Sequence, residues 1–233
     1  VSLVTGNDRR DLIVQALKPF EREIREGIRG KRVVIKPNCV WDGNPLCATH
    51  PDAIRGALDF LRPMYKGQVV IAESTASPKG TRFCFDEYKY LPIEREFNAK
   101  LVDLNEDSWS IMWIQNNKLL PNGIKIINTF LDPKNYIISL ARMKTHDCVV
   151  GTLAFKNILM AAPLNVMKGH PQFVKNQHEK AKMHEGAGER GVKGINYNMF
   201  TLAQRIRPDF SIIDGFEGME GNGPTRGAPV DHR

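Results

Sequence analysis

Charged and polar side chains gather in an otherwise apolar segment, ARMKTHDCVVGTLAFKNILM, at residues 141–160. Lys144 and His146 come first, and Lys156 and Asn157 follow one helical segment later. Lysine ammonium groups bind carboxylates and phosphates, and histidine transfers protons near neutral pH without a large pKa shift. Two interpretations are open at this point: these residues are the solvated ends of a strand and a helix, or they belong to one site.

Polar residues directly follow four apolar runs of the chain, including the run that ends in this segment. The residues in question are Lys36, Pro37 and Asn38; Glu73, Ser74 and Thr75; Arg142, Lys144, Thr145 and His146; and Asp214 and Gly215. In an open parallel sheet, ligands bind outside the carboxyl ends of the strands. Four such ends favour a shared site, and the alternative is ordinary capping and turn chemistry.

The segment Ala48-Thr49-His50-Pro51-Asp52 has the pattern of a helix start. Proline suits the first helical position, and Thr49 or His50 can serve as the cap. The free N–H groups of such a helix would bind an anion at the same sheet edge. The alternative is a well-capped helix with a solvent-facing His50.

The segment DGFEGMEGNGPTRG at residues 214–227 contains five glycines in fourteen residues. This density lets backbone N–H groups approach a ligand, so Gly221 and Gly223 are candidate binding residues. Asp214, Glu217 and Glu220 could instead hold a hard divalent cation such as Mg²⁺. The segment does not match the phosphate-binding loop or the dinucleotide-binding glycine motif.

Short apolar or β-branched runs alternate with helical patterning along the chain. The alternation predicts an α/β fold with a mostly parallel open sheet and helices on both faces. The predicted strands are residues 1–5, 32–35, 68–72, 100–104, 124–128, 136–140 and 210–213. The predicted helices are residues 9–18, 21–27, 51–61, 94–97, 152–160, 172–184 and 197–205.

We expect residues 1–233 to form a single α/β domain with two irregular segments. Residues 105–123 contain two tryptophans and end in a Pro-Asn-Gly turn signal, which predicts a strand pair inserted into the sheet. Residues 184–194 are rich in glycine and lack an apolar period. They are predicted to be a mobile surface loop, with a lid over a site as the alternative.

Composition narrows the class of partner. The chain has 33 Lys and Arg residues against 26 Asp and Glu, and its net charge of +7 favours anions. The basic residues are dispersed, so we expect a small anionic ligand or a solvated basic surface rather than nucleic acid. No apolar run approaches the roughly 20 residues of a membrane-spanning helix.

The cysteines Cys39, Cys47, Cys84 and Cys148 lie far apart, with no CxxC pair. Self-contained zinc and iron–sulfur sites usually require clustered thiolates, so we expect neither within this chain. Free thiols in the cytoplasm are the expectation, and one disulfide after export is the alternative. Export would require a twin-arginine signal, which is absent from this chain.

Several motifs together resemble one bacterial and archaeal family. They are VVIKPN at 33–38, ATHPDAIR at 48–55, the segment at 141–160, RPDFSIIDGFEGMEGNGPTRG at 207–227 and PVDH at 229–232. Their order is similar to that in the family known as domain of unknown function 362, over nearly the whole chain. The resemblance implies mainly the fold, because the chemistry of this family is poorly defined.

The resemblance also sets expectations that this chain meets only in part. Members of the family often carry ferredoxin-like cysteine clusters for iron–sulfur centres, and some carry a twin-arginine export signal. This chain has no such cluster, so the resemblance does not imply electron transfer by the chain itself. Members also continue past the last motif, so we expect the sheet to be truncated at its C-terminal side.

The preferred functional hypothesis is an enzyme that binds a small carboxylate or phosphate at the carboxyl edge of the sheet. His146 would be the general acid or base, Lys144 would supply charge, and Asp214 would orient His146 or hold a metal. The predicted substrate-binding residues are Lys36, Asn38, Thr49, His50, Lys156, Asn157, Gly221 and Gly223. The predicted metal ligands are Asp214, Glu217 and Glu220.

Two other classes of function remain open on the sequence. One is a non-catalytic redox or cofactor-maturation partner of an iron–sulfur protein such as a ferredoxin. The other is an exported anion-binding protein. No activated nucleophile is evident, so the sequence predicts no reaction class.

Overall fold

A mixed sheet of seven strands organises the protein. The computed structural model describes residues 1–166, 179–184 and 189–232. The strand order is β3-β2-β1-β6-β8-β9, with β7 paired to β6. The strands are β1 (Arg32–Pro37), β2 (Val69–Glu73), β3 (Ala99–Asp103), β6 (Asn135–His146), β7 (Val150–Thr152), β8 (Phe210–Asn222) and β9 (Arg226–Asp231).

Five neighbouring strands, from β3 to β8 in the sheet order, run parallel, and β7 and β9 pair antiparallel with β6 and β8. The predicted α/β fold with a mostly parallel open sheet is therefore confirmed.

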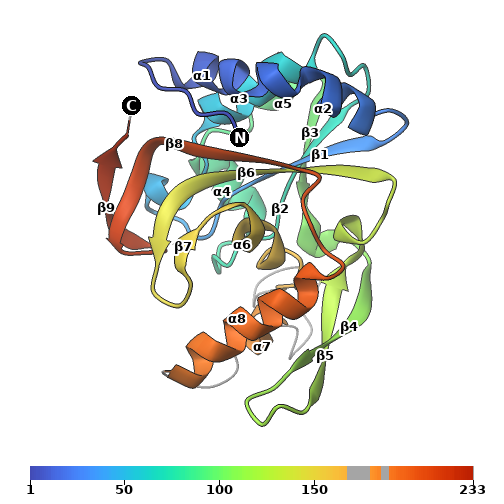
Figure 1. Ribbon diagram of the computed structural model, residues 1–233, viewed down its shortest axis with the longest axis vertical. Helices are drawn as coiled ribbons and strands as arrows, with labels where there is room; N and C mark the ends of the chain where they lie inside the picture. The colour runs from blue at the N-terminus through green and yellow to red at the C-terminus, as the bar shows by residue number, and fades with distance from the viewer. Residues whose placement is uncertain (167–178, 185–188, 233) are drawn as a thin grey trace.

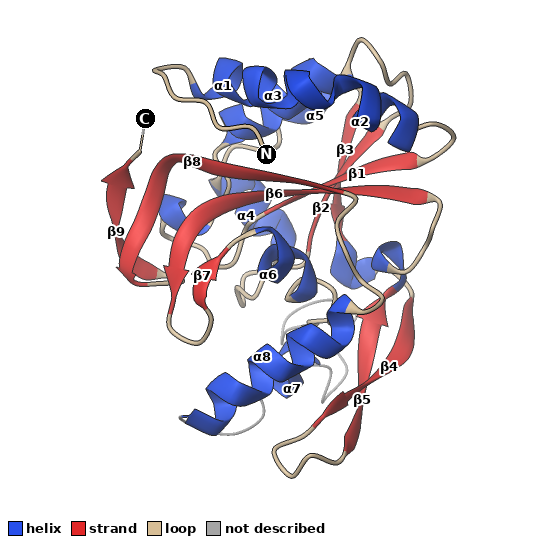
Figure 2. Ribbon diagram, viewed as in Figure 1, coloured by secondary structure: helices blue, strands red, loops and turns tan. Residues whose placement is uncertain are grey.

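Helices cover both faces of this sheet (Figures 1 and 2). The helices of the first face are α1 (Arg9–Leu17), α2 (Glu21–Gly27), α3 (Pro51–Leu61), α4 (Thr81–Glu87) and α5 (Ile93–Glu96). The second face carries α6 (Ala154–Leu159), α7 (Glu179–Met183), α8 (Glu189–Ala203) and a hairpin of β4 (Trp109–Gln115) and β5 (Pro121–Ile127). Short 3₁₀ turns are η1 (Lys18–Phe20), η2 (Pro45–Cys47), η3 (Leu104–Glu106) and η4 (Asn128–Phe130).

The side chains on the two faces of the central strands pack into two separate apolar cores. Val33 and Ile35 of β1 pack into the core under α1 and α3, whereas Val34 packs into the core under α6 and α8. Successive side chains of a strand point to opposite faces, and a strand buried on both faces is continuously apolar. The same alternation carries Lys36, which is 1% exposed, to the face of Val34 and α6.

Some predicted elements differ from the observed ones. Residues 1–5 form no strand, and α4 was not predicted. The strand pair predicted around residues 105–123 exists as β4 and β5, but it forms its own two-stranded sheet instead of joining the large one. Local composition identified the hairpin but not the sheet to which it belongs, because that depends on distant packing.

The glycine-rich segment at residues 214–227 is a second hairpin, not a loop. β8 continues to Asn222 and pairs with β9 from Glu217 onward. A Cβ atom at Gly223 would lie 2.0 Å from the carbonyl oxygen of Thr145, so this glycine permits close backbone approach. The glycines therefore serve the turn and its packing against β6.

The helical prediction for the later part of the chain requires two corrections. Helix α8 begins at Glu189, so the loop predicted for residues 184–194 is wrong from residue 189 onward, and residues 185–188 lie outside the described part. Ile195 and Leu202 of α8 are fully buried, and this packing outweighs the low helix propensity of Gly191 and Gly194. Of the helix predicted for residues 172–184, the structure describes only α7 and the residues next to it.

No helix in the described ranges is both long enough and apolar enough to cross a membrane.

Candidate functional site

A cavity of about 360 Å³ lies at the carboxyl ends of β1 and β2. Its remaining walls come from the β6–β7 turn, α6, α7 and the β8–β9 turn. Its charged and hydrogen-bonding lining includes Lys36, Asn38, Glu73, Ser74, His146, Asp147, Thr152, Lys156, Asn157, Lys180, His184 and Thr225. Segments distant in the sequence thus contribute polar groups to one place, as expected for the edge of a parallel sheet.

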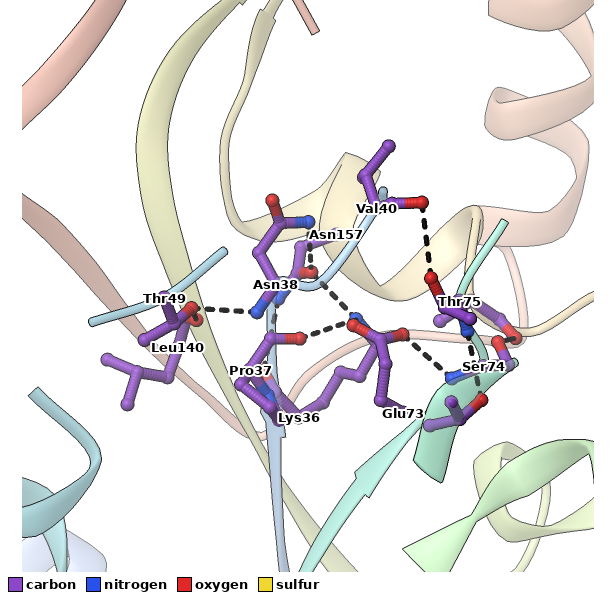
Figure 3. A network of polar contacts seen from close by, with 12 residues as sticks. Lys36, Pro37, Asn38, Val40, Thr49, Glu73, Ser74, Thr75, Leu140 and Asn157 are labelled. Atoms are coloured by element: carbon purple, nitrogen blue, oxygen red, sulfur yellow. Dashed lines mark hydrogen bonds and ion pairs between the residues drawn. The ribbon is translucent and has the colours of Figure 1, made fainter. Parts of the chain in front are cut away.

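Lys36 forms the centre of a buried hydrogen-bond network (Figure 3). Its Nζ donates to Glu73 Oε2 at 2.9 Å, to Asn157 Oδ1 at 2.8 Å and to the carbonyl oxygen of Pro37 at 2.6 Å. Glu73 Oε1 also accepts the N–H of Ser74 at 2.8 Å. Burial lowers the pKa of Lys36, and the Glu73 charge opposes this shift.

Asn157 connects α6 to the sheet. Its Nδ2 donates to the carbonyl oxygen of Lys36 at 3.1 Å and to Ser139 Oγ at 3.0 Å. Its Oδ1 also accepts from Asn38 Nδ2 at 3.1 Å. The amide fixes the first turns of α6 against β1 and β6, and so it positions Lys156 one residue earlier.

Three further lysines surround the cavity without a carboxylate partner. In the described ranges, no ion pair involves Lys144, Lys156 or Lys180. Burial, and after it the charges of Lys144 and Lys180, lower the pKa of Lys156 to about 7. Burial likewise lowers the pKa of Lys144 and of Lys180 to about 8. Since Lys36 is neutralised by Glu73, the remaining ammonium groups leave an excess of positive charge.

His146 lies at the end of β6 on the cavity wall and is 7% exposed. Its Nδ1 accepts the N–H of Cys148 at 3.1 Å, so the neutral ring carries its proton on Nε2. Asp147 Oδ1 lies 2.9 Å from the same nitrogen and favours the charged ring. Burial, and after it the charge of Lys156, outweighs this attraction and lowers the pKa of His146 to about 3. The ring is therefore neutral at pH 7.

Two buried side-chain oxygens of cavity-lining residues have no hydrogen-bond partner in the part of the chain that is described. They are Asn38 Oδ1 and Thr152 Oγ1, in side chains that are 3% and 1% exposed overall. A buried polar atom without a hydrogen bond costs about 1–3 kcal/mol. Both atoms are candidates to pair with a bound molecule.

Thr49 and His50 lie outside this cavity. Thr49 Oγ1 accepts the N–H of Asn38 and donates to the carbonyl oxygen of Leu140, each at 2.7 Å, so it joins two strands. His50 is the N-cap of α3, where its Nδ1 accepts the N–H of Asp52 at 3.2 Å. His50 therefore fits the alternative of a well-capped helix, and Thr49 has a structural role between two strands.

The structure does not bring together the three predicted metal ligands. Asp214 Oδ1 accepts from Arg9 Nε at 3.2 Å and lines a separate, more apolar cavity of about 690 Å³ beside α1. Glu217 Oε2 accepts from Arg142 Nη2 at 2.6 Å, and Glu220 is exposed. Asp214 is also absent from the lining of the cavity to which His146 belongs, so the geometry does not support its predicted role as the partner of His146.

A different group of side chains meets the distance requirement for a cation. One ligand atom each from His146, Asp147 and Cys148 lies within 4.8 Å of the other two. His146 Nδ1 is already occupied by the Cys148 N–H, which leaves less freedom for a metal. The thiols of Cys39, Cys47, Cys84 and Cys148 are all free.

The predicted glycines and Lys144 lie near the cavity rather than in its wall. Lys144 Nζ donates to the carbonyl oxygen of Pro224 at 3.4 Å, and Pro224 belongs to the lining. Gly221 has φ +87° and shapes the turn that carries Pro224. These residues support the lining instead of forming it.

Sequence reasoning missed Lys180 and Thr152 and gave Glu73 no role. Lys180 Nζ donates to the carbonyl oxygen and to Oγ of Ser74, across the cavity from β6. Nothing in the local sequence pattern of α7 distinguishes Lys180 from Lys182, which does not line the cavity. Glu73 could have been recognised as a site residue from the sequence, because it stands directly at the end of an apolar run.

The profile of the family described as domain of unknown function (DUF362) matches residues 33–233. The chain belongs to this family. The chain is similar to a thylakoid-associated protein of Synechocystis sp., to which it is 24% identical over 204 residues, which are 86% of this chain and 56% of that protein.

A solved structure from Thermotoga maritima, determined by structural genomics, shares the fold. It superposes with a TM-score of 0.55 and 11% identity over 98% of this chain and 56% of its own. The DUF362 chain described here thus spans just over half the length of both proteins. The profile match establishes the family, and the similarity to the solved structure concerns the fold alone.

Proposed function

We propose that the cavity binds a small molecule with a carboxylate or phosphate group, and that the protein is an enzyme acting on that molecule. The observation that supports this proposal is the set of three lysines that have no carboxylate partner among the described residues. Buried charges in proteins are normally paired. A bound anion would supply the missing counter-charge.

The hydrogen-bonding groups of the cavity fit the same ligand. Lys156 and Lys180 line the wall and can each donate to an oxygen of the anion. Thr152 Oγ1 can donate as well, and Asn38 Oδ1 requires a donor on the ligand. Recognition would thus combine charge with one polar group elsewhere on the molecule.

Proton transfer is assigned to Lys156 in preference to His146. An acid–base catalyst works best when its pKa lies near the working pH. The pKa of Lys156 is lowered to about 7, whereas that of His146 is lowered to about 3. We therefore assign His146 the role of donating a hydrogen bond through Nε2–H.

A titration with simple anions tests this proposal. Phosphate and malonate should raise the midpoint of thermal unfolding at constant ionic strength, whereas chloride should not. Changing Lys156→Met or Lys180→Met should weaken phosphate binding about 10- to 100-fold, because each removes a charged hydrogen bond of about 1.5–3 kcal/mol. Isothermal titration calorimetry measures the affinities.

The matched control is Lys134→Met, which removes an exposed lysine outside the cavity. It should leave phosphate affinity unchanged. Equal stabilisation by chloride and phosphate, or unchanged affinity in both cavity variants, would contradict the proposal.

A further inference from the structure

Lys156 differs from the other lysines of the cavity region in its hydrogen bonding. Lys36, Lys144 and Lys180 each donate to at least one protein oxygen. Lys156 Nζ has no hydrogen-bond partner in the described part of the chain, although the residue is only 9% exposed and lines the cavity. The backbone of Lys156 is thus held by α6, and its amine is left available to a ligand.

We propose that Lys156 is a nucleophile that forms an imine with the carbonyl carbon of a small oxo acid held in this cavity. The inference rests on the proposed function, because the neighbouring ammonium groups would hold the carboxylate of that acid. It adds the substrate class, a carboxylate with a carbonyl group. It also assigns Lys156 covalent chemistry in place of proton transfer, which then falls to Lys180.

The surroundings of Lys156 favour the neutral amine that this chemistry needs. A buried ammonium group without a partner is costly, and like charges nearby add to the cost. A lysine beside other cations in a desolvated pocket is a known form of activated nucleophile. With a pKa of about 7 instead of 10.5, the neutral fraction at pH 7 is on the order of a thousandfold larger than for an exposed lysine.

The position of the residue suits attack on a bound molecule. Asn157, the next residue of α6, is fixed to β1 and β6 by its two Nδ2 hydrogen bonds. Lys180, which lines the same cavity, remains mostly protonated at pH 7 because its pKa is about 8. The cavity therefore offers an amine nucleophile and an ammonium acid together.

The covalent step balances without a further reagent. The lone pair of the Lys156 amine forms a C–N bond to the carbonyl carbon, and the carbonyl π electrons move to oxygen. That oxygen takes a proton from Lys180, and the nitrogen passes a proton to the Lys180 amine to give the neutral carbinolamine. The hydroxyl group then takes this proton back from Lys180 and leaves as water while the nitrogen lone pair forms the C=N bond, and the resulting iminium returns its N–H proton to Lys180 to give the imine. The products are the imine and one water molecule.

Reductive trapping tests the inference. The chain is incubated with pyruvate and sodium cyanoborohydride, and intact mass and peptide mapping locate the product. We expect one saturable adduct on Lys156 that phosphate suppresses. Acetone has the carbonyl without the carboxylate and should react at least tenfold more slowly. Lactate has the carboxylate but a hydroxyl group in place of the carbonyl, so it should compete without forming an adduct.

The variants separate charge from nucleophilicity. Lys156→Arg keeps the positive charge and should abolish the adduct, whereas Lys134→Arg should leave it unchanged. Peptide mapping of the wild-type chain gives the labelled position directly, so the result does not depend on the folding of any variant.

The outcomes distinguish the inference from the proposed function. Phosphate binding without an adduct on Lys156 would overturn the inference and leave the anion site intact. Adducts spread over exposed lysines, unaffected by phosphate, would also overturn it. Absence of both phosphate binding and the adduct would remove the inference together with the proposed function.

Discussion

The single residue Lys36 shows how this protein stabilises a buried charge. Its ammonium group is 1% exposed and is satisfied by a carboxylate, an amide oxygen and a carbonyl oxygen. Such a pair adds little stability over apolar residues of the same shape, but removing one partner is costly. The Lys36–Glu73 pair therefore specifies this arrangement of side chains more than it adds stability to the fold.

We predict that Glu73→Gln destabilises the protein by about 3–5 kcal/mol, because it leaves the Lys36 ammonium buried without a counter-charge. Urea unfolding followed by circular dichroism measures the change. Glu96→Gln is the matched control, since Glu96 pairs with Arg55 at the surface, and it should cost at most about 1 kcal/mol. Equal effects of the two substitutions would contradict this account of Lys36.

At the scale of elements, α1 and α3 pack so closely that one position tolerates no side chain. A Cβ atom on Gly56 would lie 2.5 Å from the carbonyl oxygen of Arg10 and 2.9 Å from Cβ of Ile13. The backbone of α1 cannot move out of the way as the end of a flexible side chain can. The glycine therefore sets the distance between two helices that cover one face of the sheet.

We predict that Gly56→Ala destabilises the protein by up to about 2 kcal/mol. The clash costs about 1–3 kcal/mol, and the better helix propensity of alanine returns about 1 kcal/mol. Thermal unfolding by calorimetry measures the difference. Gly123→Ala is the control, because its Cβ would lie 3.5 Å from Ile111 Cγ2 in ordinary contact. A stabilised Gly56→Ala variant would show that the helices can separate freely.

At the scale of the whole molecule, the lysines around the cavity link stability to pH. The pKa values of Lys156, Lys144 and Lys180 are lowered to about 7, 8 and 8, so the unfolded chain binds more protons than the folded one above about pH 7. Stability then rises with pH in that range. The raised pKa values of Cys39 and Tyr90 act in the opposite direction at higher pH.

We predict that the free energy of unfolding increases between about pH 7 and 8.5, before cysteine and tyrosine ionisation opposes the lysines. Urea midpoints across this range measure the slope. Lys156→Met should flatten the slope, and saturating phosphate should do the same, because a bound anion keeps the lysines protonated in the folded state. A slope that is negative, or insensitive to Lys156→Met, would contradict the prediction.

The local pattern of the sequence was sufficient for the class of fold. Apolar runs separated by helical stretches indicated parallel strands with helices on both faces, and that prediction is confirmed. The polar residues at the ends of these runs also indicated the sheet edge where Lys36, Asn38, His146, Lys156 and Asn157 meet. Alternation of side chains is a property of neighbouring residues, so it can be seen in the chain itself.

Which residues belong to the site could be decided only from the tertiary structure. Asp214 follows an apolar run as Glu73 does, yet it pairs with Arg9 beside a different cavity, whereas Glu73 neutralises Lys36. Lys180 reaches the cavity from a short helix with no distinguishing local signal. The order of residues along the chain specifies which strands end in polar residues. Only the packing of α1, α6 and α7 decided which of these residues face one another, because side-chain proximity arises from contacts between segments far apart in the chain.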